Sequence, residues 1–172
     1  MSMTQIAFLR KADLPTNEQI QNTIQKLGYD FKILSSLEKR IDHHGLKCSI
    51  NGHETYFETL TDHKDSAINE HEAYWIKQDL TTQDIAVSFV WGADFAAGAC
   101  IGLICIALIE ECDALIYYID DQMQYTKEML IEDTPQFLAE LNKENNSTDH
   151  ITAFTPQLKK NSLWNRVKSM FN

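Results

Sequence analysis

The sequence lacks the glycine-containing motifs that bind phosphate or position a catalytic serine. Its six glycines are scattered, and none falls in a G-x-x-x-x-G-K-[ST], G-x-G-x-x-G or G-x-S-x-G pattern. Such patterns arrange backbone N–H groups around a phosphate or expose a nucleophile on a tight turn. Their absence leaves little positive support for an enzyme that binds nucleotides or hydrolyses esters.

Metal-binding spacings are also missing. The six histidines and four cysteines include no C-x2-C or H-x3-H pair, although Asp42, His43, His44 and Cys48 lie close together in the chain. Three cysteines fall in or beside one apolar segment, at spacings of five and seven that cannot pair within a helix. We therefore expect reduced, buried thiols, no metal and no cofactor; the cysteines are Cys48, Cys100, Cys105 and Cys112.

The start of the sequence shows no secretory signal. Residues 1–5 lack a basic segment followed by an apolar run and a small-residue cleavage site. This pattern and the expected free thiols predict a cytoplasmic protein.

One long apolar run is present. Residues 95–109 contain fifteen consecutive positions without a charged or strongly polar side chain. As a helix this run spans roughly 22 Å, short of the roughly 20 residues that a bilayer core needs. Its flanks are acidic and lack the Lys or Arg that would orient a span. The run therefore predicts a buried core helix, for which Asp94 supplies the N-cap.

Local patterns predict an α+β fold in a single domain. Thr16 and Gln19 form a capping box for a helix that ends at Gly28. Asn51 and Gly52 predict a tight hairpin turn, because both tolerate positive φ angles. We expect five or six strands in a mixed sheet with the apolar helix packed on it, and a right-handed crossover around that helix; the strand segments are 5–9, 31–34, 46–50, 55–60, 85–91 and 114–119.

The remaining segments are predicted as follows. Residues 61–72 are polar and read as a loop, and Thr134 with Pro135 predicts a helix that starts there and ends near residue 142. Residues 144–150 read as a flexible link. The chain then divides into an α+β core domain at 1–145 and a linker with a C-terminal amphipathic basic helix at 146–172.

Charge is unevenly distributed along the chain. The net charge is −10, yet the last sixteen residues contain four of the fifteen Lys and Arg residues and no carboxylate. The rest of the chain therefore holds 11 basic and 25 acidic residues, a net charge of −14. Such a body repels phosphate backbones, so we expect no nucleic-acid binding, and it attracts a basic protein partner.

Two other classes of function remain open. The basic tail places Leu163, Trp164 and Phe171 on one helical face, which is compatible with peripheral membrane binding, although docking on an acidic protein surface is favoured. Asp120 and Asp121 at a strand end, with a loop histidine, are compatible with a metal-dependent hydrolase. Strand-end Asp residues are also common turn formers.

Four segments together resemble the immunity proteins of bacterial polymorphic-toxin and type VI secretion systems: 6–9, 56–59, 87–92 and 114–121. The resemblance implies a cytoplasmic, non-catalytic domain that binds a cognate toxin and presents carboxylates to its basic cleft. No functional residue transfers by motif. From exposure and charge we expect partner contacts at Glu54, Glu58, Asp62, Asp65, Glu70, Glu72, Asp120 and Asp121.

Overall fold

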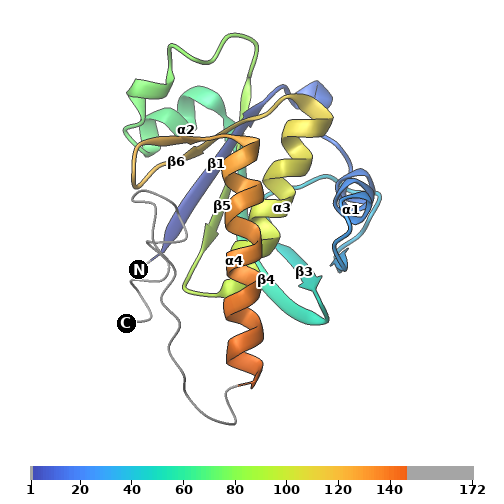
Figure 1. Cartoon of the computed structure of the whole chain (residues 1–172). Helices are drawn as coiled ribbons and strands as arrows, with labels where there is room; N and C mark the ends of the chain where they lie inside the picture. Colours follow the sequence, from blue (N-terminus) through green and yellow to red (C-terminus); the bar gives the residue numbers. More distant parts are fainter. Residues whose placement is uncertain (1, 147–172) are drawn as a thin grey trace.

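Seven strands form one sheet in the computed structural model, which describes residues 2–146 (Figure 1). The strand order is β2-β3-β4-β5-β1-β6-β7. The strands are β1 (Met3–Leu9), β2 (Phe31–Ile33), β3 (Leu46–Ile50), β4 (His53–His63), β5 (Ile85–Trp91), β6 (Leu115–Tyr118) and β7 (Met123–Tyr125). The helices are α1 (Asn17–Lys26), α2 (Lys64–Glu70), α3 (Phe95–Cys112) and α4 (Lys127–Asn146), with short 3-10 turns η1 (Lys11–Asp13) and η2 (Tyr74–Ile76).

The α+β fold class is confirmed, and the sheet differs from the expected one in two respects. Within the described residues it has seven strands where five or six were expected, and all pairings are antiparallel where a mixed sheet was expected. The reason is the position of β1, which lies between β5 and β6 and runs antiparallel to both. Helix α3 thus connects β5 to β6, which are parallel to each other but are separated by β1.

Local turn and cap chemistry is as predicted. The Thr16 side chain accepts a hydrogen bond from the Gln19 backbone N–H, and the Gln19 side chain accepts one from the Thr16 N–H at 2.8 Å. Asn51 and Gly52 both have positive φ, +50° and +80°, and join β3 to β4. These motifs fix the start of α1 and the register of the hairpin.

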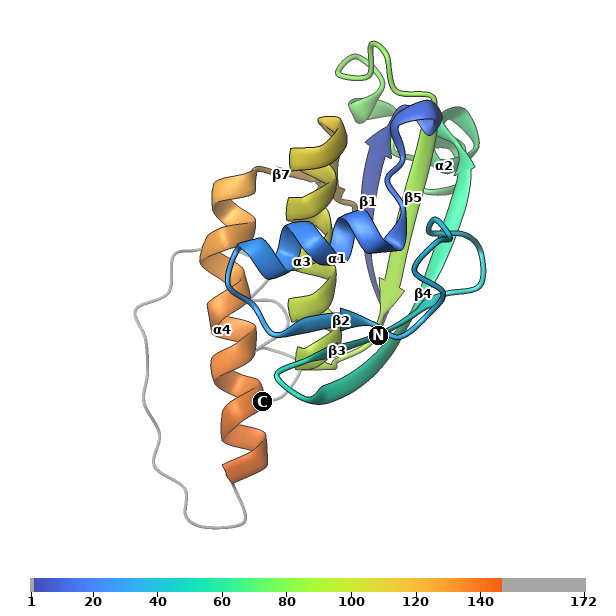
Figure 2. The same ribbon diagram turned by 90° about the vertical axis from the view of Figure 1, so that its right-hand side faces the viewer.

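Helix α3 is buried on all sides. Helices α1, α3 and α4 lie on one side of the sheet, and α2 lies on the other (Figure 2). Every residue from Phe95 to Leu108 is buried. The helix is apolar enough to cross a membrane, with a mean hydropathy of 2.0, but 78% of it is buried inside the fold. It is therefore the core helix that was predicted, consistent with a soluble domain.

On the face of the sheet opposite α3, the described elements α2 and η2 cover only part of the area. Ala67 and Ile68 of α2 and Ile76 of η2 join a buried cluster with Ile6 and Phe8 of β1. Tyr117 of β6 completes that cluster, in edge-to-face contact with Phe8 and Trp75. No described helix covers the half of this face that carries the first residues of β4.

The predicted loop at 61–72 is wrong. Strand β4 continues to His63, because Asp62 and His63 pair with Ala86 and Ile85 of β5. Helix α2 follows at once, and the His63 side chain caps it by accepting from the Asp65 N–H. Only Ala67 and Ile68 are buried in α2, too few apolar positions for a periodic signal.

The predicted start of the last helix is also wrong. Helix α4 begins at Lys127, and Pro135 lies inside it. Thr134 is buried, and its hydroxyl donates to the Leu130 carbonyl at 2.8 Å instead of capping a helix. The helix tolerates the proline because Leu130 and Phe137 bury themselves in the core.

Two further differences concern the end of the core domain. Helix α4 runs on to Asn146, so residues 144–146 are helical where a link was expected. Strand β7 was not predicted, since its three residues carry no pattern of their own. The predicted C-terminal helix lies outside the described residues.

A substitution at Gly98 would test how closely α3 is packed against its neighbours. A Cβ added there would lie 2.5 Å from Phe137 Cε1 and 2.8 Å from Trp91 Cη2. We predict that Gly98→Ala lowers the free energy of unfolding by about 1–3 kcal/mol through overpacking, despite a helix-propensity gain of about 1 kcal/mol. Urea denaturation measures this. The matched control is Gly102→Ala, whose added Cβ meets only Thr134 Oγ1 at 3.1 Å, and equal stability losses in both variants would contradict the prediction.

Gln5 provides a second stability test. It is fully buried on β1, between Phe89 and Tyr118 of the neighbouring strands, and neither polar atom of its side chain has a hydrogen-bond partner among the described residues. An unpaired buried amide costs about 1–3 kcal/mol. We predict that Gln5→Met, which keeps the side-chain length, raises the urea midpoint without changing the slope. A lowered midpoint would show that the amide is hydrogen-bonded in solution.

Candidate functional site

Three predicted carboxylates occupy one face of β4. Side chains alternate along a strand, so Glu54, Glu58 and Asp62 point to the face opposite buried Thr55 and Phe57. Glu54 and Glu58 are exposed, and Asp62 is half-buried. Glu54 forms an ion pair with Lys47 Nζ at 2.7 Å, which is exposed and therefore contributes little stability. The strand thus presents a row of acidic groups at fixed spacing.

The β6–β7 turn brings more acid to the same region. The Asp120 carboxylate accepts a hydrogen bond from the Thr4 N–H at 3.4 Å, and Asp121 follows it at an exposed position. Thr4 lies opposite Val90, which lies opposite Glu58. Glu58 on β4 and Asp120 after β6 therefore lie at similar heights along the sheet, separated by β5 and β1. Three strand spacings put them about 15 Å apart.

The other three predicted residues form a separate group. Asp65 lies in the first turn of α2, where a negative charge complements the helix dipole, and its carboxylate is 3.6 Å from His63 Nδ1. Glu70 ends α2, and Glu72 follows at a positive φ of 51°. These residues lie beyond the C-terminal end of β4, so the structure does not bring them together with Glu58 and Asp120.

Tyr56 is the main site residue that the sequence analysis missed. It lies between Glu54 and Glu58 on the outer face of β4 and is 57% exposed. It borders a hollow of about 450 Å³ that is also lined by Glu58, Val90 and Trp91. The neighbouring aromatic residues Tyr56 and Phe57 were a usable signal, because strand alternation places one of them outside.

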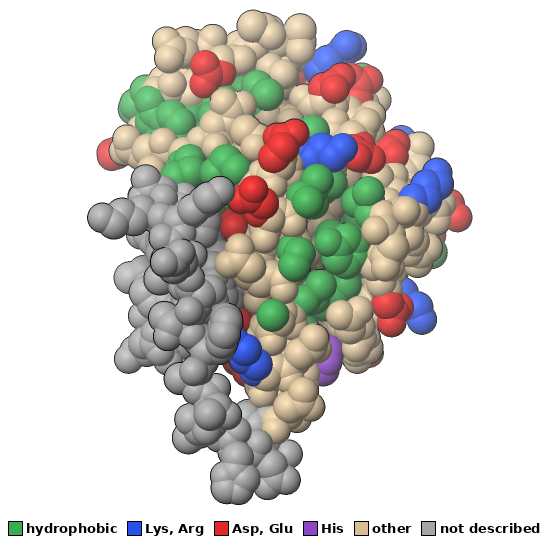
Figure 3. Space-filling model, in the orientation of Figure 1, with side chains coloured by type: hydrophobic (Ala, Val, Ile, Leu, Met, Phe, Trp, Pro, Cys, Tyr) green, Lys and Arg blue, Asp and Glu red, His purple; other side chains and the backbone are tan. Residues whose placement is uncertain are grey.

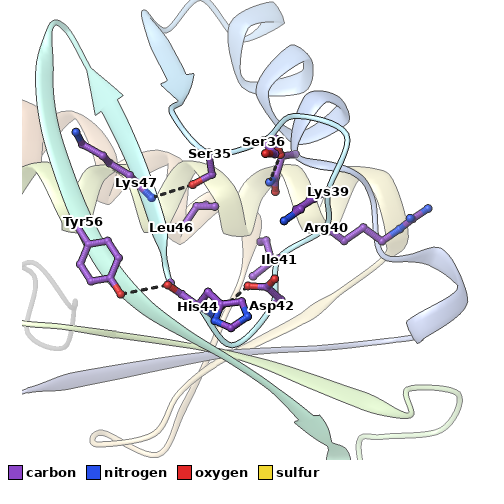
Figure 4. Close-up of a pocket in the computed structure, with 12 residues that line it drawn as sticks. Ser35, Ser36, Lys39, Arg40, Ile41, Asp42, His44, Leu46, Lys47 and Tyr56 are labelled. Atoms are coloured by element: carbon purple, nitrogen blue, oxygen red, sulfur yellow. Dashed lines mark hydrogen bonds between the residues drawn. The ribbon is translucent and has the colours of Figure 1, made fainter.

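The 34–45 loop makes a second, differently charged region. This twelve-residue segment joins β2 to β3 without regular structure, which is long for a connection between two strands. It is held near its middle and near its end, because the Asn17 N–H donates to the Lys39 carbonyl at 2.8 Å and the Tyr56 hydroxyl donates to the His44 carbonyl at 3.3 Å. A pocket of about 250 Å³ lies beneath it (Figure 4). Lys39, Arg40 and Lys47 are among its lining residues.

Gly45 closes one wall of that pocket. It has a positive φ of 76°, and a Cβ there would lie 2.3 Å from the Tyr56 hydroxyl. Only glycine allows the Tyr56 ring to lie against the loop in this conformation. The same tyrosine thus supports the loop and faces the acidic surface of β4.

None of the titratable groups in the described part of the chain has a pKa shift that would activate a nucleophile. All four cysteines are free thiols. A hydrogen bond to Cys48, together with burial, raises the pKa of Cys100, and burial raises that of Cys105. Burial raises the pKa of Cys112 to about 12. Within residues 2–146 no three His, Cys, Asp or Glu side chains are grouped as metal ligands.

These shifts predict slow thiol chemistry. At pH 8 we expect the native protein to react with Ellman's reagent at least about 100-fold more slowly than the urea-unfolded protein, because a raised pKa leaves little thiolate. Modification of Cys112 should accelerate as the pH rises toward 12. Stopped-flow absorbance measures both rates. One equivalent of fast reaction at pH 7 in the native state would reveal a reactive cysteine and contradict the prediction.

Comparisons of the chain with protein-family models, curated proteins and solved structures gave no match. Its function therefore has to be inferred from the residues and their geometry.

Proposed function

We propose that this domain is a non-catalytic binding protein that neutralises a basic protein partner, as a bacterial immunity protein neutralises its cognate toxin in the cytoplasm. The observation that carries the proposal is the outer face of β4, where Tyr56 lies exposed between Glu54 and Glu58. A hollow of about 450 Å³ adjoins the tyrosine, and Asp120 stands across the sheet. We call Tyr56, Glu58, Val90 and Asp120 the acidic sheet face.

The acidic sheet face has the composition of a protein-binding surface. Exposed tyrosines are frequent affinity anchors when they are surrounded by groups that exclude water. Val90 is half-buried on the same face as Tyr56 and gives a partner side chain an apolar surface to pack against. Because these residues stand on paired strands, their spacing is fixed before binding, which lowers the entropy cost of association.

Charge supplies the choice of partner. The chain carries a net charge of −10, and carboxylates flank Tyr56 on its own strand. Such a surface accelerates encounter with a cationic protein and disfavours polyanions such as nucleic acid. A toxin with a basic cleft is the kind of partner that the resemblance to immunity proteins implies, and the acidic sheet face has the charge to occupy one.

The test is a pull-down with the tagged full chain from its native host, washed at low and then high salt. We expect a basic protein that high salt releases and whose toxicity co-expression of this chain relieves. Retention of an acidic partner, or a basic partner whose toxicity is unchanged on co-expression, would contradict the proposal.

Point variants locate the surface. We predict that Tyr56→Ala weakens partner binding by roughly 30-fold, the effect of losing about 2 kcal/mol at an anchor. Glu58→Lys should slow association and reduce its salt dependence. Surface plasmon resonance resolves both effects. The matched control is Tyr74→Ala, because Tyr74 is 59% exposed but lies on η2, and a loss confined to that variant would move the site away from the acidic sheet face.

A further inference from the structure

A third hollow adjoins the pocket of Figure 4, and the two share Arg40, Ile41 and Asp42 of the 34–45 loop as lining residues. Its volume is about 540 Å³, within the range of roughly 300–1,000 Å³ that is typical of small-ligand sites. Leu14, Ile41 and Ile85 contribute an apolar floor, each less than a tenth exposed. The hollow therefore offers an apolar surface on which the hydrophobic part of a ligand can pack.

Arg40 places a fixed cation at this hollow. In Figure 4 its side chain runs away from the other labelled side chains. Its Nε donates to the Leu14 carbonyl at 2.8 Å, and Leu14 itself lines the third hollow. The guanidinium has further N–H donors, and no ion pair of Arg40 is found within the described residues. Its charge is thus held in place and available.

His43 and Lys11 extend the donor rim. His43 Nδ1 accepts from the Thr61 backbone N–H at 3.2 Å, which places the proton of the neutral ring on Nε2. Lys11 is exposed at the edge of the hollow. Among the described residues that line the hollow, Asp42 is the one carboxylate, and its Oδ1 already accepts from the His44 N–H at 2.9 Å. The rim presents mainly donors and cations.

We infer that this hollow binds a small amphipathic anion, with its apolar body on Leu14, Ile41 and Ile85 and its carboxylate or phosphate at Arg40, His43 and Lys11. A cationic rim around an apolar floor stands out in a chain of net charge −10, and it complements a ligand of that shape. The site is independent of the proposed partner surface, because Thr61 and Tyr56 point to opposite faces of β4.

Calorimetry on the full chain tests the inference with four probes below their micelle concentrations: decanoate, decyl phosphate, decyltrimethylammonium and acetate. We expect one molecule of decanoate or decyl phosphate to bind at least about 10-fold more tightly than the ammonium probe, and acetate to show no binding. The better of the two anions identifies the head group. Equal affinity for the anionic and cationic decyl probes would overturn the inference.

Two variants and one control locate the binding. Arg40→Gln should weaken the preferred anion at least about 10-fold. Ala12→Trp should abolish binding by filling the hollow from an exposed position that the fold does not bury. Lys26→Gln removes an exposed cation at the far end of α1 and should leave affinity unchanged. If thermal melts show that Arg40→Gln perturbs the fold, Lys11→Gln takes its place as the rim variant. The site would be refuted if both the rim variant and Ala12→Trp bound the anion with wild-type affinity.

Discussion

The fold depends on the burial of α3, a helix without a polar face. A surface helix needs one covered stripe, whereas α3 must be covered around its whole circumference. The sheet covers one side, and α1 and α4 cover the others (Figure 2). Because each large apolar side chain contributes about 1.5–3 kcal/mol when fully buried, the elements around α3 are arranged to exclude water from it. This requirement explains why α4 begins at Lys127, ahead of its proline, so that Leu130 reaches the core.

The burial of α3 also requires neighbouring side chains to approach its backbone closely. Gly98 lets Phe137 of α4 and Trp91 of β5 meet at the surface of α3, and their rings contact each other edge to face at 5.9 Å. The sheet is thereby fixed from one side by a closely packed core. Its opposite face is then free to carry exposed groups on a rigid support, which is what a recognition surface needs.

Almost no charged side chain is buried among residues 2–146, and two surface regions differ in the charge that they carry. Carboxylates lie on the outer face of β4 and at the β6–β7 turn, while Lys11, Lys39, Arg40 and Lys47 line the hollows at the 34–45 loop. On the face of the molecule that Figure 3 shows, acidic and basic side chains are interspersed. Tyr56 lies at the boundary of the two regions, because its ring is next to Gly45 of the loop and it shares the outer face of β4 with Glu54 and Glu58. A cationic protein and a small anion would therefore use separate surfaces of one strand.

The sequence alone determined the features that depend on neighbouring residues. The capping box of Thr16, the turn at Asn51 and Gly52 and the apolar run of α3 are each encoded within a few positions, and all appear as predicted. Tertiary structure alone decided which side of each strand stays open. The exposure of Tyr56, the early start of α4 and the contact of the 34–45 loop with β4 depend on pairing between residues far apart in the chain. Local periodicity carries no information about which element will cover a given face, since that choice is made by the packing of the whole core around α3.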